Sequence, residues 1–124
     1  MVKFVPEDGT WIVADTAAGI FQLKQSMSDE DYAASKRALQ HFLCDYFSSG
    51  NCDSHGANIS PIGATPKGGK RFKVRWGYPG RGKSGSLRLC IAVYCDERRV
   101  VIAQAFWRNE NPQATDFEQA TEDL

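Results

Sequence analysis

The residues with the clearest capacity for chemistry are the glycines and cations of segment 77–84 (GYPGRGKS). The segment has the spacing of a phosphate-binding P-loop, in which backbone N–H groups at the start of a helix hold the phosphates. The residues that follow, 87–94, are rich in β-branched and aromatic side chains and favour a strand. The next apolar segment, 100–107, has no carboxylate to hold the magnesium ion of a nucleotide hydrolase. The sequence therefore predicts a glycine loop between two strands, with no nucleotide cofactor.

The basic residues are concentrated in one part of the chain. From Lys67 to Arg108 there are eleven basic and two acidic residues, whereas the rest of the chain has four basic and thirteen acidic residues. Within 71–76 basic and apolar residues alternate, so Lys73 and Arg75 are predicted to point away from the core. Such a surface is typical of proteins that bind polyanions. The alternative is an exposed basic sheet face without a ligand.

The cysteine and histidine residues raise the questions of disulfide bonding and zinc binding. The four cysteines are Cys44, Cys52, Cys90 and Cys95. Without a secretory signal we expect them to be reduced, and Cys90 and Cys95 would point to opposite faces of one strand. The residues from His41 to His55 also have the spacing H-x2-C-x7-C-x2-H. Structural zinc sites usually have paired C-x2-C elements or a longer span before a histidine pair, so no metal is predicted and zinc is the alternative.

The elements that would position these residues follow from hydrophobic periodicity. Helical spacing predicts a first helix at 15–27 and a second at 28–49, which begins with Ser28 as its N-cap. The Gly/Ser/Asn/Pro-rich stretch at about 49–69 is predicted to be a flexible connection. A meander of three strands is predicted at 71–78, 86–96 and 99–107. A short strand in the first dozen residues and a frayed acidic helix at 116–124 complete an α+β fold.

Length and composition indicate a single domain spanning 1–124. The chain has 124 residues, 42% hydrophobic and 24% charged, which is enough for one core. No apolar run approaches the ~20 residues that span a membrane, and the first residues lack the apolar stretch of a signal peptide. We therefore expect a cytoplasmic protein with no membrane partner.

Three local motifs together resemble one protein family. They are MSDEDY at 27–32, GRGKSG at 80–85 followed by Arg88, and FWRNE at 106–110. They resemble, in turn, the start of the second helix, the G-R-G-K-S-G-G-x-R segment and the end of the last core strand of the RelE/HigB superfamily. These proteins are toxins of bacterial toxin–antitoxin systems, and the match is best with the HigB-like branch common on phages and plasmids. The similarity spans roughly Asp15 to Glu110.

The resemblance implies both a fold and an activity. The fold would be RelE-like, with two N-terminal helices packed on a small antiparallel β-sheet. The activity would be that of an mRNA endoribonuclease (an mRNA interferase, a hydrolase) acting on the ribosome and inhibited by a cognate antitoxin, without a cofactor. The alternative on the same fold is a non-catalytic, degenerate module that binds RNA, the ribosome or an acidic protein partner.

The resemblance also implies roles for individual residues. RNA supplies its own nucleophile, the 2′-hydroxyl, so the protein has to align it and stabilise charge on the phosphate. The implied catalytic residues are Lys73, Arg88 and Arg108. The implied RNA-binding residues are Arg75, Arg81, Lys83, Lys70 and Phe117. Phe117 lies in the region where many family members have a tyrosine that can stack on a base.

Overall fold

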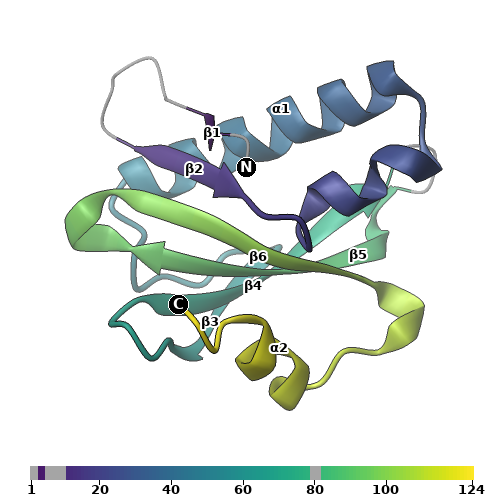
Figure 1. Cartoon of the computed structure of the whole chain (residues 1–124). Helices are drawn as coiled ribbons and strands as arrows, with labels where there is room; N and C mark the ends of the chain where they lie inside the picture. Colours follow the sequence, from purple (N-terminus) through teal and green to yellow (C-terminus); the bar gives the residue numbers. More distant parts are fainter. Residues whose placement is uncertain (1–2, 5–10, 79–81) are drawn as a thin grey trace.

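Segments that are distant in sequence meet in one β-sheet with a helix on each face. The computed structural model describes residues 3–4, 11–78 and 82–124, with side chains described for 11–25, 27–77 and 87–124. The elements are β1 (Lys3–Phe4), β2 (Ile12–Asp15), the 3-10 helix η1 (Ile20–Ser26), α1 (Asp29–Ser48), β3 (Ile59–Ala64), β4 (Lys70–Tyr78), β5 (Gly82–Tyr94), η2 (Cys95–Glu97), β6 (Arg99–Trp107), η3 (Arg108–Glu110) and α2 (Ala114–Ala120). Figure 1 shows α1 above the sheet and α2 below it. The fold is α+β, as predicted.

The sheet contains the predicted meander and a parallel pair that was not predicted. Within the described residues six strands lie in the order β1-β2-β6-β5-β4-β3. β4 pairs with β5 and β5 with β6, both antiparallel, which confirms the meander. β2, however, runs parallel to β6, with Val13 beside Val100. The prediction of a purely antiparallel sheet is therefore wrong, because the long connection from β2 to β6 permits a parallel pairing that no hairpin can make.

The glycine segment joins two strands. Tyr78 at the end of β4 pairs with Gly82 at the start of β5, and residues 79–81 lie outside the described part of the chain. A strand rather than a helix therefore follows the P-loop-like spacing. A nucleotide-binding P-loop holds phosphate at a helix N-terminus, whereas the described residues from Gly82 onward form β5.

Helix α1 agrees with the second predicted helix. Its N-cap, Ser28, accepts a hydrogen bond at its side-chain oxygen from the Asp31 N–H (3.1 Å). Leu39, Leu43 and Phe47 are buried against the sheet, and each contributes about 2 kcal/mol. The ring centroids of Phe47 and Phe72 on β4 are 5.1 Å apart. Amphipathic periodicity thus positions the helix on the sheet.

No helix among the described residues is long and apolar enough to cross a membrane.

The other helices differ from the prediction of two N-terminal helices. In place of a helix over 15–27 the chain forms β2 and then the short 3-10 helix η1. The second α-helix is α2, near the C-terminal end of the described chain, so the α-helices are not both N-terminal. Asp15 explains the change, because its buried carboxylate accepts hydrogen bonds from the backbone N–H groups of Ile20 and Phe21 at the start of η1. A Cβ on Gly19 would overlap this carboxylate.

The connection predicted at about 49–69 contains strand β3, which sequence analysis missed. β3 lies at the edge of the sheet and pairs with β4, with Ile59 opposite Val74. Pro61 and Gly63 hide the strand from a propensity-based prediction, although an edge strand tolerates proline.

A disulfide between Cys52 and Cys95 joins this connection to the turn between β5 and β6, with a Cα–Cα distance of 6.3 Å. The prediction that all four cysteines are reduced is therefore wrong for this pair, since contacts distant in sequence bring the two thiols together. The bond also removes Cys52 from the alternative zinc set, and the described residues contain no group of three His, Cys, Asp or Glu that could hold a metal. Cys90 and Cys95 do face opposite sides, because Cys90 packs under α2 and Cys95 against the main core.

Asp15 gives the fold a testable pH dependence. Its side chain is 1% exposed. Burial raises its pKa above 3.8, and backbone hydrogen bonds from Thr16, Phe21 and Ile20 and the charge of Lys36 oppose this shift. A raised folded-state pKa means that the folded protein binds the proton more tightly than the unfolded chain does. The stability from this group is therefore fully present below pH 3.8 and is lost as the pH rises through the folded pKa.

We expect Asp15→Asn to remove this dependence, because asparagine does not titrate. Urea unfolding from about pH 3.5 to about pH 7 covers the range in which a carboxyl group with a raised pKa titrates. The free energy of unfolding of the native chain, relative to that of the variant, should be greatest at the acid end. If the stability advantage of the native chain instead grows with pH, the three backbone hydrogen bonds to Asp15 lower its pKa more than burial raises it.

Candidate nucleic-acid interface

The candidate site lies on the sheet face opposite α1, which we call the outer face. On β4, Phe72 and Val74 point into the main core, so the alternating residues Arg71, Lys73 and Arg75 belong to the outer face. One part of this face is apolar and covered by α2. The other part is basic and is not covered in this way.

Three arginines come together on the basic part and form what we call the arginine cluster: Arg75, Arg88 and Arg108. Arg75 on β4 is directly opposite Arg88 on β5. Arg108 begins η3 immediately after β6. Arg88 is half-buried, and its Nη1 donates to the Leu87 carbonyl oxygen at 3.0 Å. Burial, and then the charges of Arg75 and Arg108, lower the pKa of Arg88, so Arg88 lies within electrostatic range of both.

The arginine cluster has no acidic partner within the described structure. None of its members forms an ion pair with a described carboxylate, whereas Lys70 pairs with Asp53 and Arg99 with Glu97. Like charges directly opposite each other on neighbouring strands are destabilising. A bound anion would relieve this repulsion, and planar guanidinium groups match phosphate oxygens in geometry. A cluster of like charges without acidic partners is typical of a functional site.

Lys73 lies on the outer face beside the arginine cluster. It precedes Arg75 by two residues on β4, so their Cα atoms are about 7 Å apart. It is half-buried and opposite Cys90 of β5. Burial raises the pKa of the Cys90 thiol to about 12, so this neighbour stays protonated and is a poor nucleophile.

Two other predicted RNA-binding residues do not join the cluster. Lys70 alternates with Arg71 and lies on the α1 side, where its ammonium group pairs with Asp53. Phe117 on α2 is 4% exposed and packs edge-on against Phe106, with ring centroids 5.4 Å apart. Its ring is therefore part of a small core under α2. Arg81 lies outside the described residues, and the Lys83 side chain lies outside the described side chains.

Arg71 has a structural role that sequence analysis did not predict. It is 8% exposed, its Nε donates to the Thr121 hydroxyl (2.9 Å), and its Nη2 donates to the Ala64 carbonyl oxygen (2.9 Å). The main-chain oxygen of Leu124 accepts from the Tyr94 hydroxyl at 2.6 Å. These contacts hold α2 and the residues after it on the outer face. The alternating pattern placed Arg71 on this face, but nothing in the pattern indicated that α2 would cover it.

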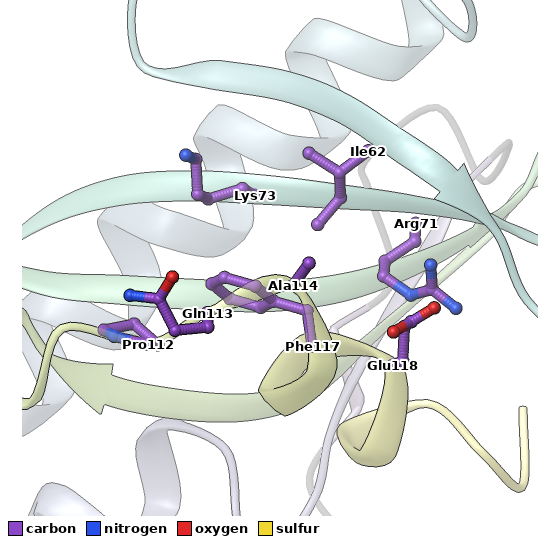
Figure 2. A pocket seen from close by; sticks show the side chains of 8 residues that line it. All are labelled: Ile62, Arg71, Lys73, Pro112, Gln113, Ala114, Phe117 and Glu118. Carbon is purple, nitrogen blue, oxygen red and sulfur yellow. The ribbon is translucent and has the colours of Figure 1, made fainter.

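A pocket of about 300 Å³ lies between α2 and the sheet, next to Lys73. Its lining includes Ile62, Arg71, Lys73, Gln113, Phe117 and Glu118. Figure 2 shows the Arg71 side chain extending toward Glu118 of α2, and Lys73 farther along β4 at the other end of the lining. The pocket combines the cations of β4 with apolar side chains and the Glu118 carboxylate of α2, and it was not predicted from the sequence.

A cluster of titratable side chains, which sequence analysis also missed, lies on the α1 side of the sheet. Tyr32 and Lys36 are one turn apart on α1, and the negative charge of Asp15 acts on the pKa of each. Burial raises the pKa of Tyr32 and lowers that of Lys36. The four-residue spacing of Tyr32 and Lys36 was the sequence signal that could have revealed this cluster. Because this group is on the other side of the sheet, it contributes nothing to the arginine cluster.

Comparisons of the chain with protein-family models, with curated proteins and with solved structures find no match. The arginine cluster and the local motifs therefore carry the functional conclusion.

Proposed function

We propose that the chain is the toxin of a toxin–antitoxin system and an mRNA endoribonuclease of the RelE/HigB type. The observation that carries this proposal is the arginine cluster, in which Arg75, Arg88 and Arg108 interact without a described carboxylate partner. Two of the family-like motifs lead into this cluster, since Arg88 follows GRGKSG and Arg108 belongs to FWRNE. The RelE-like fold is part of the same proposal, supported by the α+β architecture and the meander.

The proposed reaction is the attack of an RNA 2′-hydroxyl on the neighbouring phosphate. The bond from O2′ to phosphorus forms and the bond from phosphorus to O5′ breaks, leaving a 2′,3′-cyclic phosphate and a 5′-hydroxyl. Arg88 and Arg108 bind the phosphoryl oxygens and stabilise the charge that develops on them. Arg75 holds the strand in line for the attack.

Two protons move in this reaction. Lys73, next to the cluster, takes the proton of the 2′-hydroxyl when its amine is neutral, and a water molecule supplies the proton to O5′. No cofactor takes part in the proposed reaction.

The proposal also defines partners and a location. The RNA is mRNA held on the ribosome, which places the chain in the cytoplasm. The cognate antitoxin would present acidic residues to the arginine cluster, so their association should weaken as salt screens the charges.

One observation favours a second candidate, a non-catalytic RNA-binding module on the same face. Neither histidine belongs to the arginine cluster: His41 lies on α1, across the sheet, and His55 is in the connection before β3, where it hydrogen-bonds to Ser60 (3.0 Å), the residue opposite Lys73. Arginine is a poor base because its pKa exceeds ~12. Binding without cleavage would need the arginine cluster alone.

Primer-extension mapping of mRNA in a translating extract tests the proposal. The native chain should create new 5′ ends inside codons, and the Arg88→Ala, Arg108→Ala double variant should create none. The matched control is Lys24→Ala, Arg37→Ala, which removes two exposed cations elsewhere on the chain and should cleave normally. Salt-sensitive RNA binding without new ends would favour the non-catalytic module.

A further inference from the structure

We infer that the pocket under α2 binds one nucleobase of the RNA strand whose phosphate lies on the arginine cluster, and that it prefers guanine. This inference rests on the proposed function and adds a base-recognition site to it. The pocket and the cluster share the outer face, and Lys73 lies between them: it lines the pocket and is two residues from Arg75.

Size and polarity suit a single base. At about 300 Å³ the pocket is at the lower end of the range for small-ligand sites, and polar and apolar side chains both line it. Ile62, Pro112 and Phe117 supply apolar surface. Sequence-specific proteins bind unstacked RNA bases in this way, between apolar or aromatic side chains with polar groups at the base edge.

The pocket is preformed, because α2 is capped at its start and attached to the sheet at its end. At its start, the Gln113 N–H donates to the Asp116 carboxylate (2.7 Å). At its end, Arg71 donates to Thr121, and the Phe117 ring is buried between them. A preformed site loses less conformational entropy when a ligand binds.

The polar groups on the pocket wall favour guanine. Glu118 offers a carboxylate, which accepts hydrogen bonds only, and the Nζ of Lys73 offers N–H donors whether or not it is protonated. The Gln113 side chain is held locally, since its Nε2 donates to the Asn111 carbonyl oxygen (2.9 Å). Among the four RNA bases, guanine alone presents an imino and an amino N–H side by side for one carboxylate. Its carbonyl and ring nitrogen can accept from the lysine.

Titration of the ¹⁵N-labelled protein with the four ribonucleoside monophosphates tests this site. GMP should bind most tightly and shift the backbone amides of Ile62, Lys73 and Gln113. Ala114→Trp, which fills the pocket from the first residue of α2, should weaken GMP binding at least ~10-fold, a loss typical of a misfit in a small pocket. Thr115→Trp is the matched control, since Thr115 is exposed on the same turn and should leave GMP binding unchanged.

Two further variants distinguish a failure of the base site from a failure of the proposed function. Glu118→Gln should remove the preference for GMP over AMP, and it provides a second test if Ala114→Trp does not fold. The Arg88→Ala, Arg108→Ala variant should weaken the binding of all short RNAs while keeping the preference for guanine. Equal binding of the four nucleotides, shifts elsewhere, or equal effects of the two tryptophan variants would overturn the base site alone. Unchanged RNA affinity in the arginine variant would instead overturn the proposed function.

Discussion

Replacing Arg88 and Arg108 with alanine should lower the affinity for single-stranded RNA about 25-fold at about 0.1 M salt. Each cation that neutralises a phosphate of a single strand contributes about 0.7 to the slope of log affinity against log salt. Removing two such contacts should therefore reduce this slope by about 1.4. Equilibrium binding of a labelled oligonucleotide over a range of salt concentrations measures both quantities.

The control for this prediction is the Lys24→Ala, Arg37→Ala variant, which changes the net charge by the same amount. Lys24 is on η1 and Arg37 on α1, both exposed and remote from the outer face. Its slope should remain that of the native chain. If both variants lose affinity equally, the RNA responds to net charge, and the arginine cluster is not a defined site.

Breaking the disulfide between Cys52 and Cys95 should lower the free energy of unfolding by about 4 kcal/mol, the chain-entropy value for cysteines 43 residues apart. The bond restricts the unfolded chain, and it attaches the connection before β3 to the turn after β5. Urea unfolding of the native chain and of Cys52→Ala, Cys95→Ala, each with and without a reductant, measures the effect. Reductant should destabilise the native chain and leave the variant unchanged.

Thiol titration in denaturant without reductant provides the control. It should detect two thiols, those of Cys44 and Cys90, and reductant should raise the number to four. Four thiols at the start would contradict the disulfide. The result also bears on location, because a reducing cytoplasm keeps such pairs as thiols. In that compartment we expect the less stable, reduced form.

The parts of the fold that could be predicted are those set by local pattern. The apolar spacing of Leu39, Leu43 and Phe47 predicted α1, and the alternation from Arg71 to Trp76 predicted β4 and its outward cations. β3 could not be predicted in this way, because its pairing with β4 compensates for a proline and a glycine. The parallel pairing of β2 and the bond from Cys52 to Cys95 likewise depend on contacts distant in sequence.

The candidate site divides in the same manner. The alternation of side chains along β4 placed Arg75 on the outer face. The same alternation puts Lys70, which was predicted to bind RNA, on the other side of the sheet. That Arg108 would approach Arg88 depends on the turn after β6. The burial of Phe117 and the pocket beside it depend on where α2 packs, which no local pattern of an acidic C-terminal segment specifies.

The central claim is that this chain cleaves RNA through the 2′-hydroxyl at the arginine cluster, and the chemistry of the RNA ends tests it most directly. An mRNA translated in an extract with the native chain should yield fragments whose 3′ ends carry a 2′,3′-cyclic phosphate, measured by mass spectrometry. The Arg88→Ala, Arg108→Ala variant should yield none. Intact mRNA with the native chain, or the same ends with the double variant, would contradict the claim.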